Sequence, residues 1–136
     1  SDPVFSRVAI IGAGLIGSSI ARASREYGTA DEIVLYDASP EVRARAAEIG
    51  LGEVAPTLEA AVAGADCVIL CVPVGALGAV AAGAVPAMKD GAILTDVGSV
   101  KSEAARALTA AGDARIHVIP GHPIAGTEQS GPDAGF

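Results

Sequence analysis

Apolar residues fall along the chain into two kinds of segment: short continuous runs, and longer stretches in which they recur every three or four positions. Continuous apolar runs are typical of strands covered on both faces, whereas the longer spacing is typical of helices that bury one face. Because the two kinds alternate along the chain, the pattern predicts an α/β fold. Such a fold is a doubly wound, mainly parallel sheet with helices on both faces.

The expected strands are, in chain order, Arg7–Gly12, Glu32–Tyr36, a weak Gly52–Ala55, Asp66–Cys71, Ala92–Thr95 and Arg115–Ile119. The expected helices are Leu15–Tyr27, one from Pro40 to a stop at Gly50, Thr57–Ala63, Gly75–Ala87 and Val100–Ala111. Ser39 and Thr57 are predicted N-caps, and Gly28 is the predicted C-cap of the first helix. The apolar stripe of that helix is predicted to comprise Ile16, Ile20, Ala23 and Tyr27.

Length and composition fit one folded domain, because the chain has 136 residues of which 51% are hydrophobic and 18% are charged. We assign a single domain to residues 1–136, with an N-terminal tail at 1–6 and a Gly/Pro-rich loop at 120–136. The net charge is −7 and no polybasic run occurs. These features argue against nucleic acid or a membrane surface as a partner.

The stretch Cys67–Met88 has no charged residue and is long enough for a membrane helix. Prolines and glycines interrupt it, so we predict a buried strand, a turn at Pro73 and an Ala-rich helix instead. Cys67 and Cys71 lie four residues apart, on one face of that strand. No second pair of Cys or His residues completes a zinc site, so we expect no metal. A buried, reduced pair indicates a cytoplasmic protein.

The run Gly12-Ala13-Gly14-Leu15-Ile16-Gly17 follows an apolar strand and opens a helix, and Asp37 stands twenty residues beyond Gly17. This context is that of the dinucleotide-binding loop in Rossmann-type folds. There the first glycine permits a tight turn, the second leaves room for the pyrophosphate, and the third lets the helix lie close to the strand. The alternative is a glycine turn that serves packing alone.

Asp37 predicts NAD rather than NADP, because a carboxylate there accepts hydrogen bonds from the ribose hydroxyls and repels a 2′-phosphate. Ala38 adds no positive charge, and Arg43 lies a turn further along the next helix. The alternative for Asp37 is a solvated side chain at a strand end. Val72-Pro73-Val74 predicts an apolar wall against the cofactor, or only a strand-to-helix turn. The predicted cofactor contacts are Gly12, Ala13, Gly14, Leu15, Ile16, Gly17, Asp37, Cys71, Val72, Pro73 and Asp96.

Two histidines are candidates for the base that a nicotinamide-dependent oxidation needs. His117 lies within the last predicted strand, which favours a structural or surface position. His122 follows that strand in a loop. An imidazole has an unperturbed pKa of about 6.5, which suits proton acceptance near neutral pH.

The run Gly121–Gly131, which reads Gly-His-Pro-Ile-Ala-Gly-Thr-Glu-Gln-Ser-Gly, resembles the signature loop of the prephenate dehydrogenase family. That family includes the arogenate and cyclohexadienyl dehydrogenases of tyrosine biosynthesis. Asp96–Lys101 resembles its second signature, and Gly12–Gly17 resembles its nucleotide loop. The three motifs follow the family's order and spacing across essentially the whole chain.

The resemblance implies NAD(P)-dependent oxidation of prephenate or arogenate, in which a hydride leaves ring C4, carbon dioxide is lost and the ring becomes aromatic. His122 matches the histidine that accepts the proton of the C4 hydroxyl. Ser99 matches the serine that contacts this hydroxyl and helps to place His122 and the nicotinamide, although Ser99 also stands where a helix cap is expected. Thr127 and Glu128 are implied substrate contacts.

The chain differs in length from members of the family that it resembles. Its members usually continue into an all-helical domain that forms the homodimer and supplies an arginine for the substrate carboxylate. None of the seven arginines here lies in a strand-end motif. We therefore expect these 136 residues to be the nucleotide-binding half of a larger enzyme, and to bind NAD while turning over little substrate.

Two other interpretations stay open at this point. One is another Rossmann dehydrogenase with a helical partner domain, of the β-hydroxyacid or pyrroline-carboxylate reductase type. It would not be expected to carry the His-Pro-Ile-Ala-Gly-Thr-Glu run. The other is a non-enzymatic NAD-binding module, which would not need His122.

Overall fold

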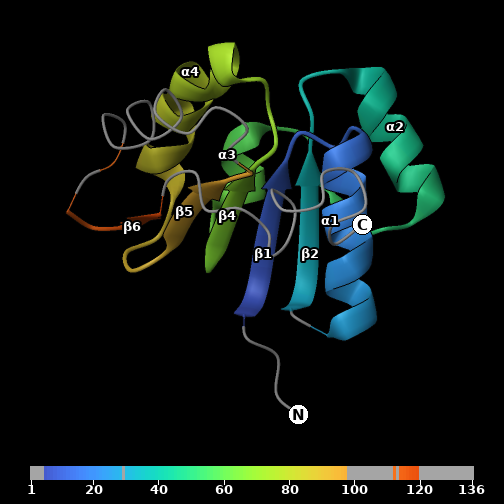
Figure 1. The fold of residues 1–136 in the computed structure, drawn as a ribbon, viewed down its shortest axis with the longest axis horizontal. Helices are drawn as coiled ribbons and strands as arrows, with labels where there is room; N and C mark the ends of the chain where they lie inside the picture. Colours follow the sequence, from blue (N-terminus) through green and yellow to red (C-terminus); the bar gives the residue numbers. More distant parts are fainter. Residues whose placement is uncertain (1–4, 29, 98–111, 113, 120–136) are drawn as a thin grey trace, which may run out of the picture.

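The computed structural model describes residues 5–28, 30–97, 112 and 114–119. Its strands are β1 (Phe5–Ile11), β2 (Ala30–Tyr36), β3 (Glu53–Val54), β4 (Cys67–Leu70), β5 (Ile93–Asp96) and β6 (His117–Ile119). They form one sheet in the order β3-β2-β1-β4-β5-β6, and every neighbouring pair is parallel (Figure 1). This order reverses direction between β1 and β4, which is where ligands bind on sheets of this kind. The predicted doubly wound sheet is confirmed.

Four helices and one 3₁₀ turn connect the described strands: α1 (Leu15–Tyr27), α2 (Pro40–Ile49), α3 (Leu58–Val62), α4 (Val74–Ala84) and η1 (Val85–Ala87). The predicted N-caps are confirmed. The Ser39 hydroxyl accepts a hydrogen bond from the N–H of Val42, and the Thr57 hydroxyl accepts one from the N–H of Ala60. Gly28 ends α1 in the left-handed conformation, as expected. The helix predicted at 100–111 and the loop at 120–136 lie outside the described residues.

The core consists of two layers of apolar side chains, one on each face of the sheet. Ile10 and Leu35 point to the face that α1 and α2 cover. Ile11 and Val34, their neighbours in sequence, point to the face that α3 and α4 cover. Alternation along each strand therefore fills both layers. Continuous apolar runs were the right signal for strands covered on both sides (Figure 1).

Tyr27 corrects one expectation, because its side chain is 80% exposed and does not continue the buried stripe of α1. The buried face of α1 instead includes Gly17, Ile20 and Ala21. Successive helical residues are about 100° apart, so Tyr27, seven positions after Ile20, points within about 20° of that buried side chain. Tyr27 is the last residue of α1, so its place at the end of the helix, and not the rotation of the helix, accounts for its exposure.

The apolar stretch that could suggest a membrane helix forms β4, α4 and η1, as predicted. Within the described part of the chain, no helix combines the length and hydropathy that crossing a bilayer requires. β1 begins at Phe5, inside the segment expected to be a tail.

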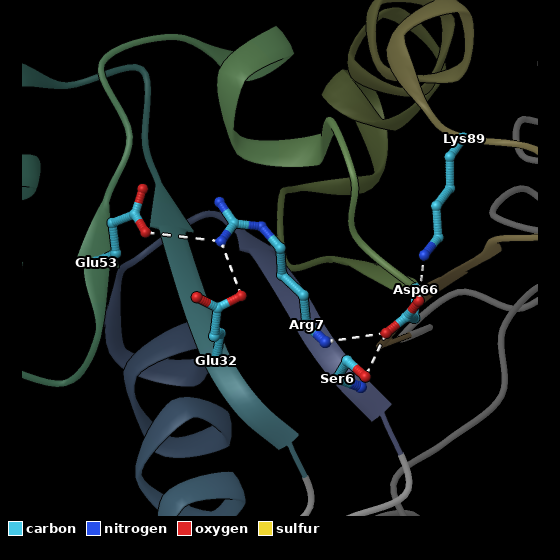
Figure 2. A network of polar contacts seen from close by, with 6 residues as sticks. All are labelled: Ser6, Arg7, Glu32, Glu53, Asp66 and Lys89. Carbon is cyan, nitrogen blue, oxygen red and sulfur yellow. Dashed lines mark hydrogen bonds and ion pairs between the residues drawn. The ribbon is translucent and has the colours of Figure 1, made fainter.

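Charged side chains hold the sheet together at its amino edge, where the strands begin (Figure 2). Asp66, just before β4, accepts hydrogen bonds from the N–H groups of Ser6 and Arg7 at 2.8 and 3.0 Å, and it pairs with Lys89. The Arg7 guanidinium lies 3.3 Å from a carboxylate oxygen of Glu32 and 3.6 Å from one of Glu53. This network joins five strands, or the segments that lead into them, because Lys89 precedes β5.

A fourth ion pair lies at the same edge. Arg115 precedes β6 and lies 3.1 Å from Asp90. Its guanidinium also donates to the carbonyl oxygens of Val85 and Met88 at 2.8 and 3.0 Å. Arg115 therefore ties the entrance of β6 to the end of η1.

Candidate functional site

A cleft of about 530 Å³ opens at the carboxyl edge of the sheet, beside the point where the strand order reverses. The residues that line it come from the ends of β1, β2 and β4 and from α3 and α4. They are Ile11, Gly12, Gly14, Tyr36, Asp37, Ala38, Leu58, Cys71, Val72, Pro73, Ala76, Ala79 and Val80. The cleft is mainly apolar with a few polar groups, and its volume is in the usual range for a small-molecule site. Six of the predicted cofactor contacts meet here.

Gly12 and Gly17 are glycines for reasons of packing. Gly12 has a φ of +101°, and a Cβ on it would lie 2.4 Å from the carbonyl oxygen of Cys71. A Cβ on Gly17 would lie 1.9 Å from the carbonyl oxygen of Gly12 and 3.4 Å from Ile10 on β1. The predicted tight turn at Gly12 and the close approach of α1 at Gly17 are both found.

Gly14 differs from the other two glycines, because neither packing nor backbone conformation requires glycine there. A Cβ on Gly14 would meet no atom within 4 Å, and its φ of −75° is accessible to any residue. Gly14 is among the residues that line the cleft, so the absence of a side chain leaves room there.

The helix that begins at Gly14 has no side chain that caps its first N–H groups, and no acidic residue lies in its first turn. In contrast, Ser39 and Thr57 cap α2 and α3 with their own hydroxyls. Uncapped N–H groups and the positive end of the helix dipole favour a bound anion, and a pyrophosphate is one. Leu15 and Ile16 open this helix, and their side chains lie outside the description.

Asp37 directly follows β2 and holds two neighbouring loops with its carboxylate. One oxygen accepts the N–H of Ala13, in the glycine loop, at 3.0 Å, and the other accepts the N–H of Ser39 at 2.9 Å. A carboxylate has about four acceptor positions, so two remain for ribose hydroxyls. Asp37 thus does more than its sequence position indicated, because it also fixes the loop that would contact the pyrophosphate. Ala13 contributes through this backbone bond.

Arg43 reaches the same place, which its spacing in sequence did not suggest. Its guanidinium donates a hydrogen bond to the backbone carbonyl of Asp37 at 2.6 Å and lies 5.6 Å from the centre of the Tyr36 ring. The sequence placed Arg43 one turn along α2. The length of the side chain carries its charge back to the end of β2. A positive charge therefore does lie beside Asp37, and this corrects the expectation that none would.

Cys71 and Asp96 lie at the ends of the neighbouring strands β4 and β5. Asp96 is buried, with 4% of its surface exposed. Burial, and secondarily the charge of Asp96, raise the pKa of the Cys71 thiol to about 12. Cys71 is therefore a neutral side chain that lines the cleft, and it is not a nucleophile at neutral pH. Asp96 is not among the residues that line the cleft.

The apolar wall of the cleft is larger than the sequence suggested. Val72 and Pro73 line it, and Pro73 is also the N-cap of α4, which confirms the strand-to-helix turn. Leu58 of α3 and Ala76, Ala79 and Val80 of α4 extend the wall. The spacing of these α4 residues by three and four positions was the signal that could have identified them, because it places them on one helix face.

The residues assigned to chemistry, which are Ser99, His122, Thr127 and Glu128, lie outside the described residues. His117 is exposed on β6, where its backbone N–H bonds to the carbonyl of Ala92 at 2.8 Å. This is the surface position that its sequence context predicts.

A second cleft of about 490 Å³ lies at the opposite, amino edge, between the start of β2, the start of β3 and the end of α1. Its side chains include Arg25, Asp31, Glu32 and Glu53. Gly50 and Gly52 line it, but they follow the end of α2 and do not open a helix. Among the described residues, this cleft therefore lacks the strand ends and the helix start that bind nucleotides on such sheets. In the part of the chain that is described, no cluster of three or more His, Cys, Asp or Glu side chains could hold a metal ion.

Comparison with known proteins relates this geometry to one family. The model of the nucleotide-binding domain of prephenate dehydrogenase matches residues 20–136. A cyclohexadienyl dehydrogenase of Zymomonas mobilis subsp. mobilis is 49% identical over 134 residues, which are 98% of this chain and 45% of that protein. A prephenate dehydrogenase of Lactococcus lactis subsp. cremoris is 36% identical over 127 residues, which are 92% of this chain and 36% of that protein.

Solved structures agree with these sequence matches. The prephenate dehydrogenase from A. aeolicus, in complex with hydroxyphenyl propionate and NAD+, superposes with a TM-score of 0.74 and 31% identity. The match covers 90% of this chain and 43% of that one. The chain thus spans less than half the length of each of these relatives.

Proposed function

The chain belongs to the prephenate dehydrogenase family, with the family's nucleotide-binding domain as its match, and we propose that it binds NAD in the cleft at the carboxyl edge. We further propose that the protein that carries it oxidises prephenate, arogenate or both, with loss of carbon dioxide. The observation that carries the NAD proposal is Gly14. Neither packing nor backbone conformation requires glycine at this position, which lines the cleft at the uncapped start of a helix.

Different groups of described residues would contact the pyrophosphate, the ribose and the adenosine of NAD. The N–H groups at the start of α1 face the pyrophosphate, and Gly14 leaves room for it. The Asp37 carboxylate accepts the ribose hydroxyls with the acceptor positions that Ala13 and Ser39 leave open. The apolar side chains of α3 and α4 cover the adenosine end of the cleft. The bound cofactor supplies the hydride acceptor.

The proposed chemistry assigns proton transfer to the chain. His122 accepts the proton of the C4 hydroxyl as the hydride leaves C4, which relieves the positive charge that develops at that carbon. The electron pair of the bond to the ring carboxylate enters the ring as carbon dioxide departs, and a proton returned to the ring oxygen completes the phenol. Ser99 positions the hydroxyl and His122. Loss of carbon dioxide and formation of the aromatic ring make the sequence irreversible.

The first test is binding of NAD to the 136-residue chain and to its Gly14→Ala variant, by calorimetric titration. Wild type is expected to bind, and the variant is expected to lose roughly tenfold or more in affinity while melting at the same temperature, because only the ligand meets the new methyl group. Equal affinities of wild type and variant would contradict the proposed position of the pyrophosphate. Absence of NAD binding by wild type would contradict the proposed function itself.

The second test is NADH formation by the full-length protein with prephenate and with arogenate, each with NAD and NADP. Turnover of either substrate supports the reaction, and the ratio identifies the preferred substrate. A full-length His122→Asn protein should bind NAD normally and lose turnover, whereas retained turnover would remove His122 from its role. The 136-residue chain alone is expected to bind NAD without normal turnover. The cytoplasmic location and the homodimer stay predictions.

A further inference from the structure

We infer that Arg43 is a specificity-determining residue that lets the ribose end of the cleft accept a 2′-phosphate, so that the protein uses NADP as a second cofactor beside NAD. This inference rests on the proposed NAD site and goes beyond it. The position of Asp37 alone predicts that a 2′-phosphate is repelled. The structure adds a cation at the same place.

The position of the guanidinium follows from contacts on both faces of the sheet. Arg43 belongs to α2, whose neighbouring residue Val42 packs in the core layer beneath α1 and α2. Tyr36, which the guanidinium covers, packs in the other layer, beneath α3 and α4. A side chain that starts on one face and covers a ring on the other must cross the carboxyl edge of the sheet. It crosses beside Asp37, whose backbone carbonyl it contacts at 2.6 Å.

This is also where the cleft reaches β2, because Tyr36, Asp37 and Ala38 all line it. A ribose held by the Asp37 carboxylate would present its 2′ position to the same segment. Arg43 is not itself among the residues that line the cleft, but its guanidinium contacts Asp37 and Tyr36, which are, and so lies beside the subsite that distinguishes the two cofactors.

Arg43 has donors to spare for a phosphate. A guanidinium has five N–H donors, and the bond to the Asp37 carbonyl uses one of them. Among the described residues, Arg43 forms no ion pair, in contrast to Arg7 and Arg115, which pair with carboxylates at the other edge. Stacking on the Tyr36 ring holds the guanidinium plane in place, and a fixed planar fork suits bidentate contact with a phosphate.

The charges beside this subsite also nearly cancel. The Asp37 carboxylate contributes one negative charge and the Arg43 guanidinium one positive charge, so a 2′-phosphate meets a dipolar site instead of a lone anion. Asp37 then explains a preference for NAD, and Arg43 explains why NADP is still accepted.

The test compares the binding of NAD and NADP to the 136-residue chain by calorimetric titration, in wild type, Arg43→Gln and Arg45→Gln. Gln at position 43 removes the charge and, because it is shorter than Arg, also the reach to the Asp37 carbonyl. Arg45 is the matched control, because it is an exposed arginine on the same helix whose removal changes the net charge equally. Arg43→Gln is expected to weaken NADP binding by roughly tenfold or more and NAD binding by less than about threefold, as loss of a charge-assisted contact implies. Arg45→Gln should leave the ratio unchanged.

Two further measurements test the role of the Arg43 charge even if Arg43→Gln folds poorly. Arg43→Lys retains the charge and should keep most of the affinity for NADP. Added salt should weaken the binding of NADP to wild type more than that of NAD, because the extra contact is ionic. Normal binding of NAD with a ratio that neither Arg43→Gln nor salt changes would overturn this inference alone. The same change of ratio in Arg45→Gln, or no measurable NADP binding to wild type, would also overturn it. Loss of NAD binding in wild type would overturn the proposed function as well.

Discussion

Replacing Gly17 by Ala should destabilise the domain more than any other single methyl group added to the glycine loop. The new Cβ would lie 1.9 Å from the carbonyl oxygen of Gly12, about 1.5 Å closer than ordinary contact. The obstructing atom belongs to the backbone of a turn whose own conformation, with φ of +101° at Gly12, leaves little freedom to move. Relief therefore requires α1 to move away from β1, which opens the packing around the buried residues Ile20 and Ala21.

The expected cost is about 3 kcal/mol or more, the upper end of what overpacking of a core produces. This is a large part of the roughly 5–15 kcal/mol that stabilises a domain. For a chain of this length it corresponds to a fall in melting temperature of about 10 °C or more.

Thermal and urea unfolding of the 136-residue chain, followed by far-UV circular dichroism, measure this effect. Gly14→Ala is the matched control, since it adds the same methyl group three residues earlier where no atom lies within 4 Å. The control should change stability by about 0.5 kcal/mol or less. The reasoning fails if Gly17→Ala melts within about 2 °C of wild type, or if Gly14→Ala loses as much stability as Gly17→Ala.

Three other predictions concern the charged and thiol groups. Asp37→Ala removes the acceptor of two backbone N–H groups, so urea unfolding should show a loss of about 2 kcal/mol, with weaker NAD binding in titration; unchanged stability would contradict the role given to these bonds. The ion pair with Lys89, together with the N–H groups of Arg7 and Ser6, lowers the pKa of Asp66 below its ordinary value of 3.8. The stability that ionised Asp66 contributes to the fold is therefore present above pH 3.8 and is lost as the pH falls through the pKa of the folded state. Asp66→Asn should destabilise the chain at pH 7 and much less at pH 3. Equal losses of stability at the two pH values would refute this role of Asp66. Burial raises the pKa of Cys71 to about 12 and that of Cys67 to about 11, so iodoacetamide at pH 8 should label both slowly in the folded chain and rapidly in urea, and rapid labelling when folded would contradict their burial.

Local signals in the sequence were sufficient for the elements and the loop, because each depends on residues close together in the chain. The limits of α1 were predicted to the residue, since the glycine loop and Gly28 bound it. The roles of Gly12 and Gly17 followed from a motif with a known backbone geometry.

Contacts between distant segments could not be predicted in this way. The bond from Ala13 to Asp37 joins residues 24 positions apart, and the guanidinium of Arg43 reaches its place by crossing the edge of the sheet. The exposure of Tyr27 depends on how far along α1 the packing against the sheet extends, since Ile20 points in nearly the same direction and is buried. Side-chain reach and the extent of packing are properties of the assembled sheet, and a pattern along the chain does not contain them.

Four ion pairs among the described residues lie at the amino edge of the sheet, away from the proposed ligand site, and Figure 2 shows the three formed by Arg7 and Asp66. Substitutions among the strand ends that face the cofactor can therefore accumulate without disturbing the electrostatic contacts that align the strands. Apart from Gly12, Gly17 and Asp37, which also hold the fold, residues at the carboxyl edge can therefore diverge in cofactor or substrate preference while the ion pairs at the amino edge are kept. It offers a physical route by which relatives that share this sheet could acquire different specificities.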